Sequence, residues 1–367
     1  MRLRMRRRHA MVLGGAGLAL LTAVTAVVLA VPRLNRAAPA DPVEAEAVAT
    51  MRALAGQVAE APAARYTGTL RPAGRSPFTI DARVTAAGTA LAELRVDGQV
   101  AEAADFGDRT FVKGGQSFWH WAGIHDDRKH EFTHDRWVLV PPEFLGFDLG
   151  DGLGAGGAMA GHRAADPVVG DPGTLGGIGV RPVGAGGFVY QISIAAPARL
   201  VRVVTVASRA DGDLLELAPA VLAGPDRQRF FTELRTAASE AATAADVSGL
   251  FEFEGETEFK LCGTETCMVL MKVVNKAPLT GRHVAAQAPA GGVVEVGVVI
   301  EGRNVRTCTD HVSLKPGEST VIRCFAVYEA AGGRFVEAES DVSGQALAPD
   351  QAGRLRADLA AELERYA

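Results

Sequence analysis

The sequence predicts an α+β protein. We expect an apolar N-terminal helix, an antiparallel β-meander with helices, and an all-β sandwich followed by a C-terminal helix. Three observations predict this order within the 367 residues: an uncharged apolar run near the amino terminus, period-two strand patterns after it, and four cysteines confined to the last third. Hydrophobic residues make up 48% and charged residues 22%, which is ordinary for a folded chain.

The amino terminus has the pattern of a membrane anchor. Five arginines within the first eight residues precede the uncharged residues 11–31. As a helix rising about 1.5 Å per residue, that run would span the roughly 30 Å hydrocarbon core of a bilayer. The positive-inside tendency keeps the arginines cytoplasmic. We therefore expect a cytoplasmic segment (1–10), a transmembrane signal-anchor (11–31), a linker (32–42) and an extracytoplasmic bulk in a single-pass protein of the cell membrane.

A cleaved leader is the alternative, and the protein would then be secreted. Ala38-Pro39-Ala40 offers a small-x-small cleavage pattern before Asp41. The apolar run, however, is longer than the roughly 7–15 residues of the apolar h-region in a signal peptide, and Arg33 and Arg36 separate it from that pattern. No cysteine lies close after the run, since the first one in the chain is Cys262, and this excludes a lipid-modified cysteine as the anchor.

The next region, residues 43–222, reads as one helix followed by an antiparallel meander. Spacing of three to four predicts a helix over 43–61, which Pro62 ends. The connections between the strands are too short for parallel crossovers. Residues 146–187 are rich in glycine and predict loops around one short helix; no GK[ST] and no βαβ unit accompany them, so they are not a phosphate loop. The predicted strands cover 78–85, 90–96, 110–113, 117–121, 136–140, 188–194 and 200–207.

Two helices flank a second all-β region. A helix over 225–245 lies in a predicted linker, residues 223–248, and a C-terminal helix over 349–366 occupies the segment 346–367. Between them, residues 249–345 carry apolar strands over 268–274, 293–300 and 320–327, separated by polar turns. Strands at such regular intervals are typical of a β-sandwich.

The cysteine spacing favours two local disulfides, although four cysteines permit three connectivities. Cys262 and Cys267 bracket a four-residue turn, and Cys308 and Cys324 lie eight residues either side of Pro316. A hairpin folded at Pro316 would place the second pair opposite one another. Zinc is the alternative, but this spacing is poor for a tetrahedral site. Disulfides agree with an oxidising compartment outside the cytoplasm.

The first region resembles the LprG/LppX-like envelope lipoproteins of actinobacteria, and more loosely the LolA-like half-barrels. The resemblance covers residues of about 45–220 and lacks the acylated cysteine of those relatives. The short sequence motifs that carry the resemblance are Tyr66-Thr-Gly-Thr-Leu70, Thr85-Ala-Ala-Gly-Thr-Ala90, Thr110-Phe-Val-Lys113 with Phe118-Trp119, Arg136-Trp137-Val138 and Ala196-Pro197-Ala198-Arg199-Leu200-Val201-Arg202. The second region, about 249–342, is similar to disulfide-bearing Ig-like modules of exported proteins, which implies no activity.

The resemblance implies a curved antiparallel half-barrel whose apolar cavity holds lipid acyl chains. The alternative is a closed core, in which the same side chains pack against the 43–61 helix. A closed core is the default expectation, because burying each of these side chains stabilises the fold by about 1.5–3 kcal/mol. The candidate cavity residues are Phe78, Ile80, Val84, Leu94, Val96, Phe111 and Trp119.

The densest polar cluster runs from Trp119 to Trp137. His125, His130 and His134 could bind zinc or copper with Asp126 or Asp135. We favour a polar loop between two strands, and expect no metal and no cofactor. No G-x-S-x-G motif occurs and no carboxylate pair stands in an apolar setting, so we expect no enzyme.

These patterns predict a non-catalytic, membrane-anchored envelope protein that binds lipid or another apolar ligand. The alternative is a structural or interaction protein that uses the sandwich to bind an envelope partner. Beyond residue 40 the chain has 31 basic and 43 acidic residues, so it is not expected to bind nucleic acid.

Overall fold

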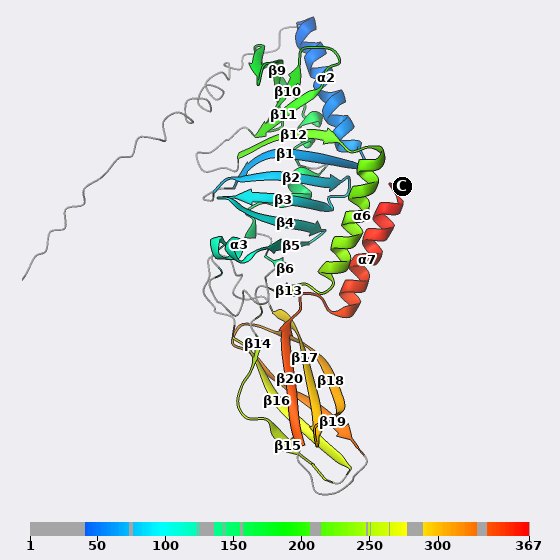
Figure 1. Ribbon diagram of the computed structural model, residues 1–367. Helices are drawn as coiled ribbons and strands as arrows, with labels where there is room; N and C mark the ends of the chain where they lie inside the picture. Colours follow the sequence, from blue (N-terminus) through cyan, green and yellow to red (C-terminus); the bar gives the residue numbers. More distant parts are fainter. Residues whose placement is uncertain are drawn as a thin grey trace, which may run out of the picture.

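The computed structural model describes residues 41–72, 76–122, 124, 136–141, 144–154, 157–205, 214–246, 249, 251–263, 265–276, 289–328 and 336–366. It confirms the α+β class, with a large sheet covered by helices and a smaller two-sheet sandwich (Figure 1). Within these ranges, no helix is both long and apolar enough to span a bilayer. The apolar run 11–31 lies outside them.

The first domain is built on a curved sheet of thirteen strands. Its order is β13-β6-β5-β4-β3-β2-β1-β12-β11-β10-β9-β7, with β8 beside β9, and every pairing except β13 with β6 is antiparallel. The strands are β1 (Ala63–Arg71), β2 (Phe78–Thr85), β3 (Ala90–Val96), β4 (Gln99–Phe106), β5 (Arg109–Gly114), β6 (Trp137–Val140), β7 (Val168–Val169), β8 (Gly173–Leu175), β9 (Ile178–Ala185), β10 (Phe188–Ser193), β11 (Leu200–Thr205), β12 (Leu214–Val221) and β13 (Ala245–Asp246).

Helix α2 (Pro42–Glu60) confirms the helix predicted over 43–61. The Asp41 side chain caps it by accepting a hydrogen bond from the Val43 amide at 3.0 Å, and Pro42 stands in the first turn, where its missing N–H costs nothing. Its face of Met51, Ala55 and Val58 is buried against one side of the sheet. The helix runs along the β9–β12 part of that side (Figure 1).

The same side is covered further along by α3 (Gln116–Trp121), and here the predicted strand over 117–121 is wrong. The run Ser117–Trp121 is short and aromatic, so periodicity alone does not separate a strand from a helical turn. In the structure Phe118 and Trp119 are both buried, although they are adjacent in sequence. A helix allows this where a strand would point one of them to the other face.

The glycine-rich segment also fills this side of the sheet rather than forming open loops. It contains α5 (Leu149–Leu153) and the 3₁₀ turn η2 (Ala160–Arg163), and it continues into β9, a strand that the sequence did not predict. Gly150 lies so close to the Gly88 carbonyl that a Cβ there would stand 2.3 Å from the oxygen. The buried side chains here are Leu149, Leu153 and Met159 of the segment, together with Phe144 and Leu145 just before it.

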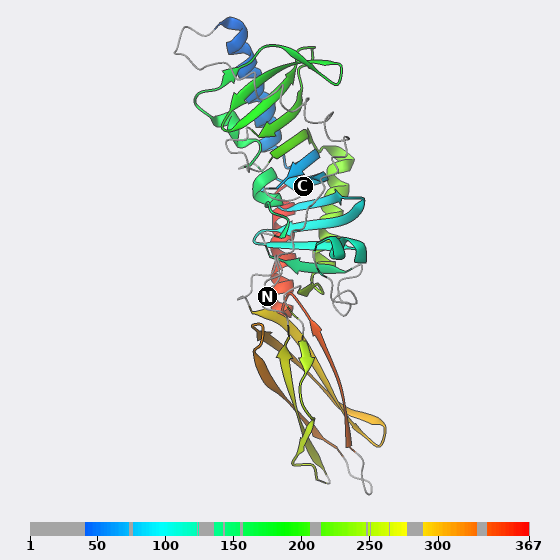
Figure 2. The ribbon, with the colours of Figure 1, turned by 90° about the vertical axis from the view of Figure 1, so that its left-hand side faces the viewer.

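The opposite side of the sheet is covered by two helices from distant parts of the sequence. Helix α6 (Gly224–Ala241) follows β12, whereas α7 (Pro349–Glu364) follows the sandwich and returns to lie beside α6 (Figures 1 and 2). Phe230, Phe231 and Leu234 of α6 are buried there with Leu355 and Leu359 of α7. The sandwich is therefore inserted between two helices of the first domain.

The sandwich holds two sheets around an apolar core, and both predicted disulfides are confirmed. One sheet has the order β14-β16-β15 with β19 beside β16, and the other β18-β17-β20. Cys262 is bonded to Cys267 and Cys308 to Cys324. The strands are β14 (Phe251–Phe253), β15 (Glu258–Lys260), β16 (Thr266–Asn275), β17 (Ala290–Ile300), β18 (Arg303–Leu314), β19 (Ser319–Val327) and β20 (Val336–Gly344).

The molecule is elongated. The start of α2 lies at one end, and the sandwich extends from the other end of the first domain (Figures 1 and 2). Within the sandwich, β14 lies near the first domain and β15 lies toward the far tip (Figure 1).

Candidate functional site

Six of the seven candidate cavity residues share one core on the α2 side of the sheet. All seven side chains are buried, at 2% exposure or less. Phe111 is separate, because it points to the opposite side and packs with the α6 and α7 residues, while its neighbour Val112 faces α2. The structure thus brings together Phe78, Ile80, Val84, Leu94, Val96 and Trp119.

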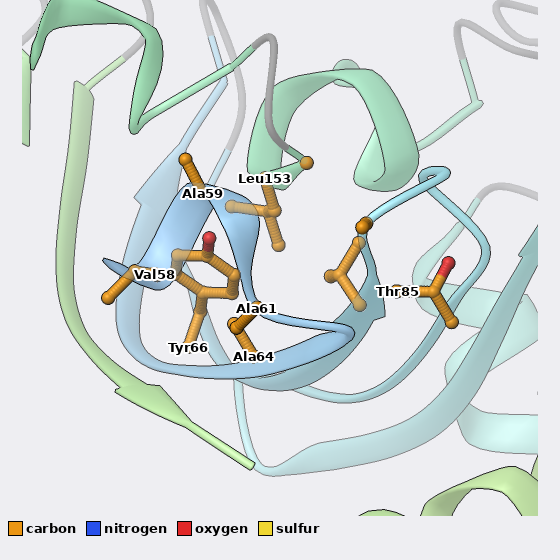
Figure 3. A pocket seen from close by; sticks show the side chains of 10 residues that line it. Val58, Ala59, Ala61, Ala64, Tyr66, Thr85 and Leu153 are labelled. Atoms are coloured by element: carbon orange, nitrogen blue, oxygen red, sulfur yellow. The ribbon is translucent and has the colours of Figure 1, made fainter. Parts of the chain in front are cut away.

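The space beside this core is small. A hollow of about 10 Å³ lies between the end of α2, the start of β1 and α5. Figure 3 shows Val58, Tyr66 and Leu153 around it. That volume holds about one water molecule. A drug-sized or lipid ligand needs several hundred Å³, so these side chains pack as a closed core in this structure.

Larger hollows occur on the outside of the first domain. One of about 400 Å³ lies along α7, beside Phe106, Arg109 and Glu362, and one of about 360 Å³ lies between α6 and the sheet. A third, of about 330 Å³, is lined by paired charges such as Arg65 with Asp81. None of these three is lined by a candidate cavity residue.

Asp105 is a buried acid that the sequence did not single out. It is 1% exposed, its Oδ2 accepts a hydrogen bond from the Gly150 amide at 3.2 Å, and its Oδ1 has no hydrogen-bond partner among the described residues. Burial first, and then the charge of Asp148, raise its pKa to about 7. Its hydrogen bond with the Gly150 amide holds α5 against β4. The carboxyl groups of Asp148 and Asp151 lie close enough to Asp105 to contribute to the raised pKa.

The predicted polar loop is not open to a structural test. His125, His130 and His134 lie outside the described residues, as do Asp126 and Asp135. Among the residues that the structure does describe, no cluster of three or more His, Cys, Asp or Glu side chains could hold a metal ion.

The sandwich presents an exposed apolar surface on the outer side of β16 and β19. On β19, Val321, Phe325 and Val327 are 51%, 47% and 67% exposed. The alternate residues Ile322, Cys324 and Ala326 face the core. Antiparallel pairing places Met268 opposite Phe325 and brings the other outward residues of the two strands together. We call this surface the sandwich outer face; its residues are Thr266, Met268, Leu270, Lys272, Val321, Arg323, Phe325 and Val327.

This face carries charged side chains as well as apolar ones. Glu258 and Lys260 of β15 lie across from Leu270 and Met268 and form an ion pair with each other at 2.8 Å. Neither β16 nor β19 contains an acidic residue. Lys272 forms an ion pair with Glu254 of the segment after β14, at 2.6 Å. Arg323 is exposed between Val321 and Phe325, and no acidic side chain in the described ranges lies within ion-pair distance of it. A cation surrounded by apolar surface is suited to binding rather than to chemistry.

The sequence contained a signal for this face that the strand prediction did not use. The strand predicted over 320–327 has apolar residues on both sides, with Ile322, Cys324 and Ala326 between the outward positions. A strand with one wet side should alternate apolar and polar residues. An apolar outward side on a strand of a small sandwich indicates a surface that is covered by something else.

Comparison with known proteins gives no family for the chain. No protein-family model matches it, and no curated protein matches it. Two solved structures are similar in part. One is the MucA/MucB complex of Pseudomonas aeruginosa, at 12% identity and a TM-score of 0.24 over 77% of this chain and 94% of that one. The other is MucB in complex with MucA(peri), at 11% identity and 0.21 over 85% and 97%. Such TM-scores establish neither a shared fold nor a shared function.

Proposed function

We propose that this chain is a non-catalytic envelope protein that binds a protein partner through the sandwich outer face. The observation that carries the proposal is the exposure of Val321, Phe325 and Val327 on one strand, next to Met268 and Leu270. Contiguous apolar surface of this kind is rare on a protein that acts alone, and it marks an interaction site.

The arrangement of the molecule favours a protein rather than a membrane as the occupant. If residues 11–31 anchor the chain, the ten residues 32–41 reach at most about 35 Å from the bilayer to the start of α2. The sandwich lies at the other end of the elongated first domain (Figures 1 and 2). Its outer face is then presented away from the membrane, where another envelope protein can reach it.

Lipid carriage, the other function that the sequence predicts, would require the first domain to open. The buried side chains of α5 and α2 fill the α2 side of the sheet, and the hollow beside them holds about 10 Å³. A lipid chain could enter only if one of these helices left the sheet. The outer face needs no such change, and for this reason we favour it.

Photo-crosslinking in the cells that make the protein tests the proposal. A photoreactive amino acid replaces Phe325 in the full chain, and in a matched variant it replaces Val100 of β4, which is 46% exposed on the first domain. We expect one discrete protein adduct from position 325, lost when Val321 and Val327 are changed to Ser, and none from position 100. Equal adducts from both positions, or none from 325, would overturn the proposal.

A further inference from the structure

We infer that the partner docks through an acidic segment that places a carboxylate on Arg323, between apolar side chains that contact Val321 and Phe325. This inference rests on the proposed function and adds the chemistry of the partner. The structure suggests it because the one arginine of β19 is central in the outer face and lacks an ion-pair partner among the described residues.

The position of Arg323 defines which residue types the partner segment would need at successive positions. It lies directly opposite Leu270 of β16 and between Val321 and Phe325 along its own strand. Outward residues two apart on a strand are about 6.5–7 Å apart. A carboxylate bound by the guanidinium would therefore be flanked on both sides by apolar surface, which lowers the local dielectric and strengthens the charge-assisted hydrogen bond.

The charge of the remaining surface supports an acidic rather than a basic partner. Beyond residue 40 the chain carries 43 acidic and 31 basic residues, so most of it repels acidic polypeptides. The outer face differs at Arg323, which has no ion-pair partner among the described residues, whereas Lys272 is paired with Glu254 and the neighbouring Lys260 of β15 with Glu258. An acidic segment would be attracted to Arg323, whereas a basic segment would be repelled by it.

Selection from a random library of displayed 16-residue peptides, using the full chain in detergent, tests the inference. We expect the enriched peptides to be acidic, with apolar residues around the acidic position. We expect Arg323→Glu to weaken their binding at least about tenfold, because a like charge replaces the attraction. The matched control is Arg356→Glu on the exposed side of α7, which should change affinity by less than about twofold.

The outcomes separate this inference from the proposed function. Enriched peptides that depend on both Phe325 and Arg323, and whose affinity falls with salt, support it. If the enriched peptides are neutral or basic, fail to bind the Phe325→Ser variant and bind the Arg323→Glu variant as well as the parent chain, the acidic partner is refuted. The outer face then remains supported as the docking surface. Peptides insensitive to both changes, or no enrichment at all, overturn both. Thermal unfolding of each variant, which should match the parent chain because these side chains are exposed, excludes misfolding.

Discussion

Asp105 by itself is expected to make the stability of the first domain depend on pH. Burial chiefly raises its pKa from the ordinary 3.8 of an aspartate to about 7. The folded state therefore binds this proton more tightly than the unfolded state. Its contribution to stability is fully present below about pH 4 and is lost as pH rises through about 7. Stability should fall across that window because the ionised carboxylate is buried without a cation.

The variant Asp105→Asn should remove this dependence. The amide keeps the acceptor for the Gly150 N–H and carries no charge at any pH. At pH 8 we expect it to be about 1–3 kcal/mol more stable than the parent chain, and at pH 4 about equal to it. Urea unfolding at both pH values measures this. Asp166→Asn, at an exposed position, is the control and should show no gain; an equal gain there would point to net charge instead of burial.

Glu362 connects the C-terminal helix α7 to the large sheet through side-chain hydrogen bonds. It is buried on α7, and its two carboxylate oxygens accept hydrogen bonds from the Thr85 and Thr89 hydroxyls, at 2.5 and 2.6 Å. Glu362→Ala would leave both hydroxyls buried without an acceptor and should destabilise the domain by about 2–4 kcal/mol. Denaturant unfolding should show a change below about 0.5 kcal/mol for Glu364→Ala, which is exposed. Similar losses in both would contradict this role.

Among the elements, α5 decides whether the first domain has a cavity. Leu149 is fully buried against the sheet, on a helix of only five residues. Leu149→Ala should cost about 2–5 kcal/mol, since it removes apolar contacts and leaves a void. Leu261→Ala provides the matched substitution at a side chain that is 72% exposed, and should cost less than about 0.5 kcal/mol. Thermal or denaturant unfolding compares the two. Equal, small losses would mean that α5 does not seal the sheet.

Local patterns predicted the long helices and fewer than half of the described strands, and the exceptions have physical reasons. The helices at 43–61, 225–245 and 349–366 were recognised because their periodicity is long and regular, and nine of the twenty described strands were recognised from alternation or apolar runs, whereas others such as β1, β4, β12, β18 and β20 were not. The segment 117–121 was too short and too aromatic to separate a strand from a helix. The segment 146–187 has weak periodicity because its glycines serve close backbone contacts, such as Gly150 on Gly88. Its buried leucines could therefore not be assigned to the sheet.

At the scale of the whole molecule, the packing of elements that are distant in the chain could not be predicted from the sequence. Leucines at spacing of four showed that residues 349–366 form an amphipathic helix, but not that it returns past the sandwich to α6. The disulfides, by contrast, were predicted correctly because each joins residues close in sequence. The outer face could be predicted only in part. Its apolar positions can be read from the sequence of β19, but which residues of β16 lie beside them depends on the register of the two strands.

Native mass spectrometry of the full chain, purified from its own cells, tests the central claim most directly. That claim is a closed first domain combined with a protein-binding sandwich. We expect the mass of the chain plus one protein partner and no stoichiometric lipid, and loss of the partner in the Phe325→Ser, Val327→Ser variant. A chain that carries lipid at one-to-one stoichiometry and no protein, in both the parent and the variant, would contradict it.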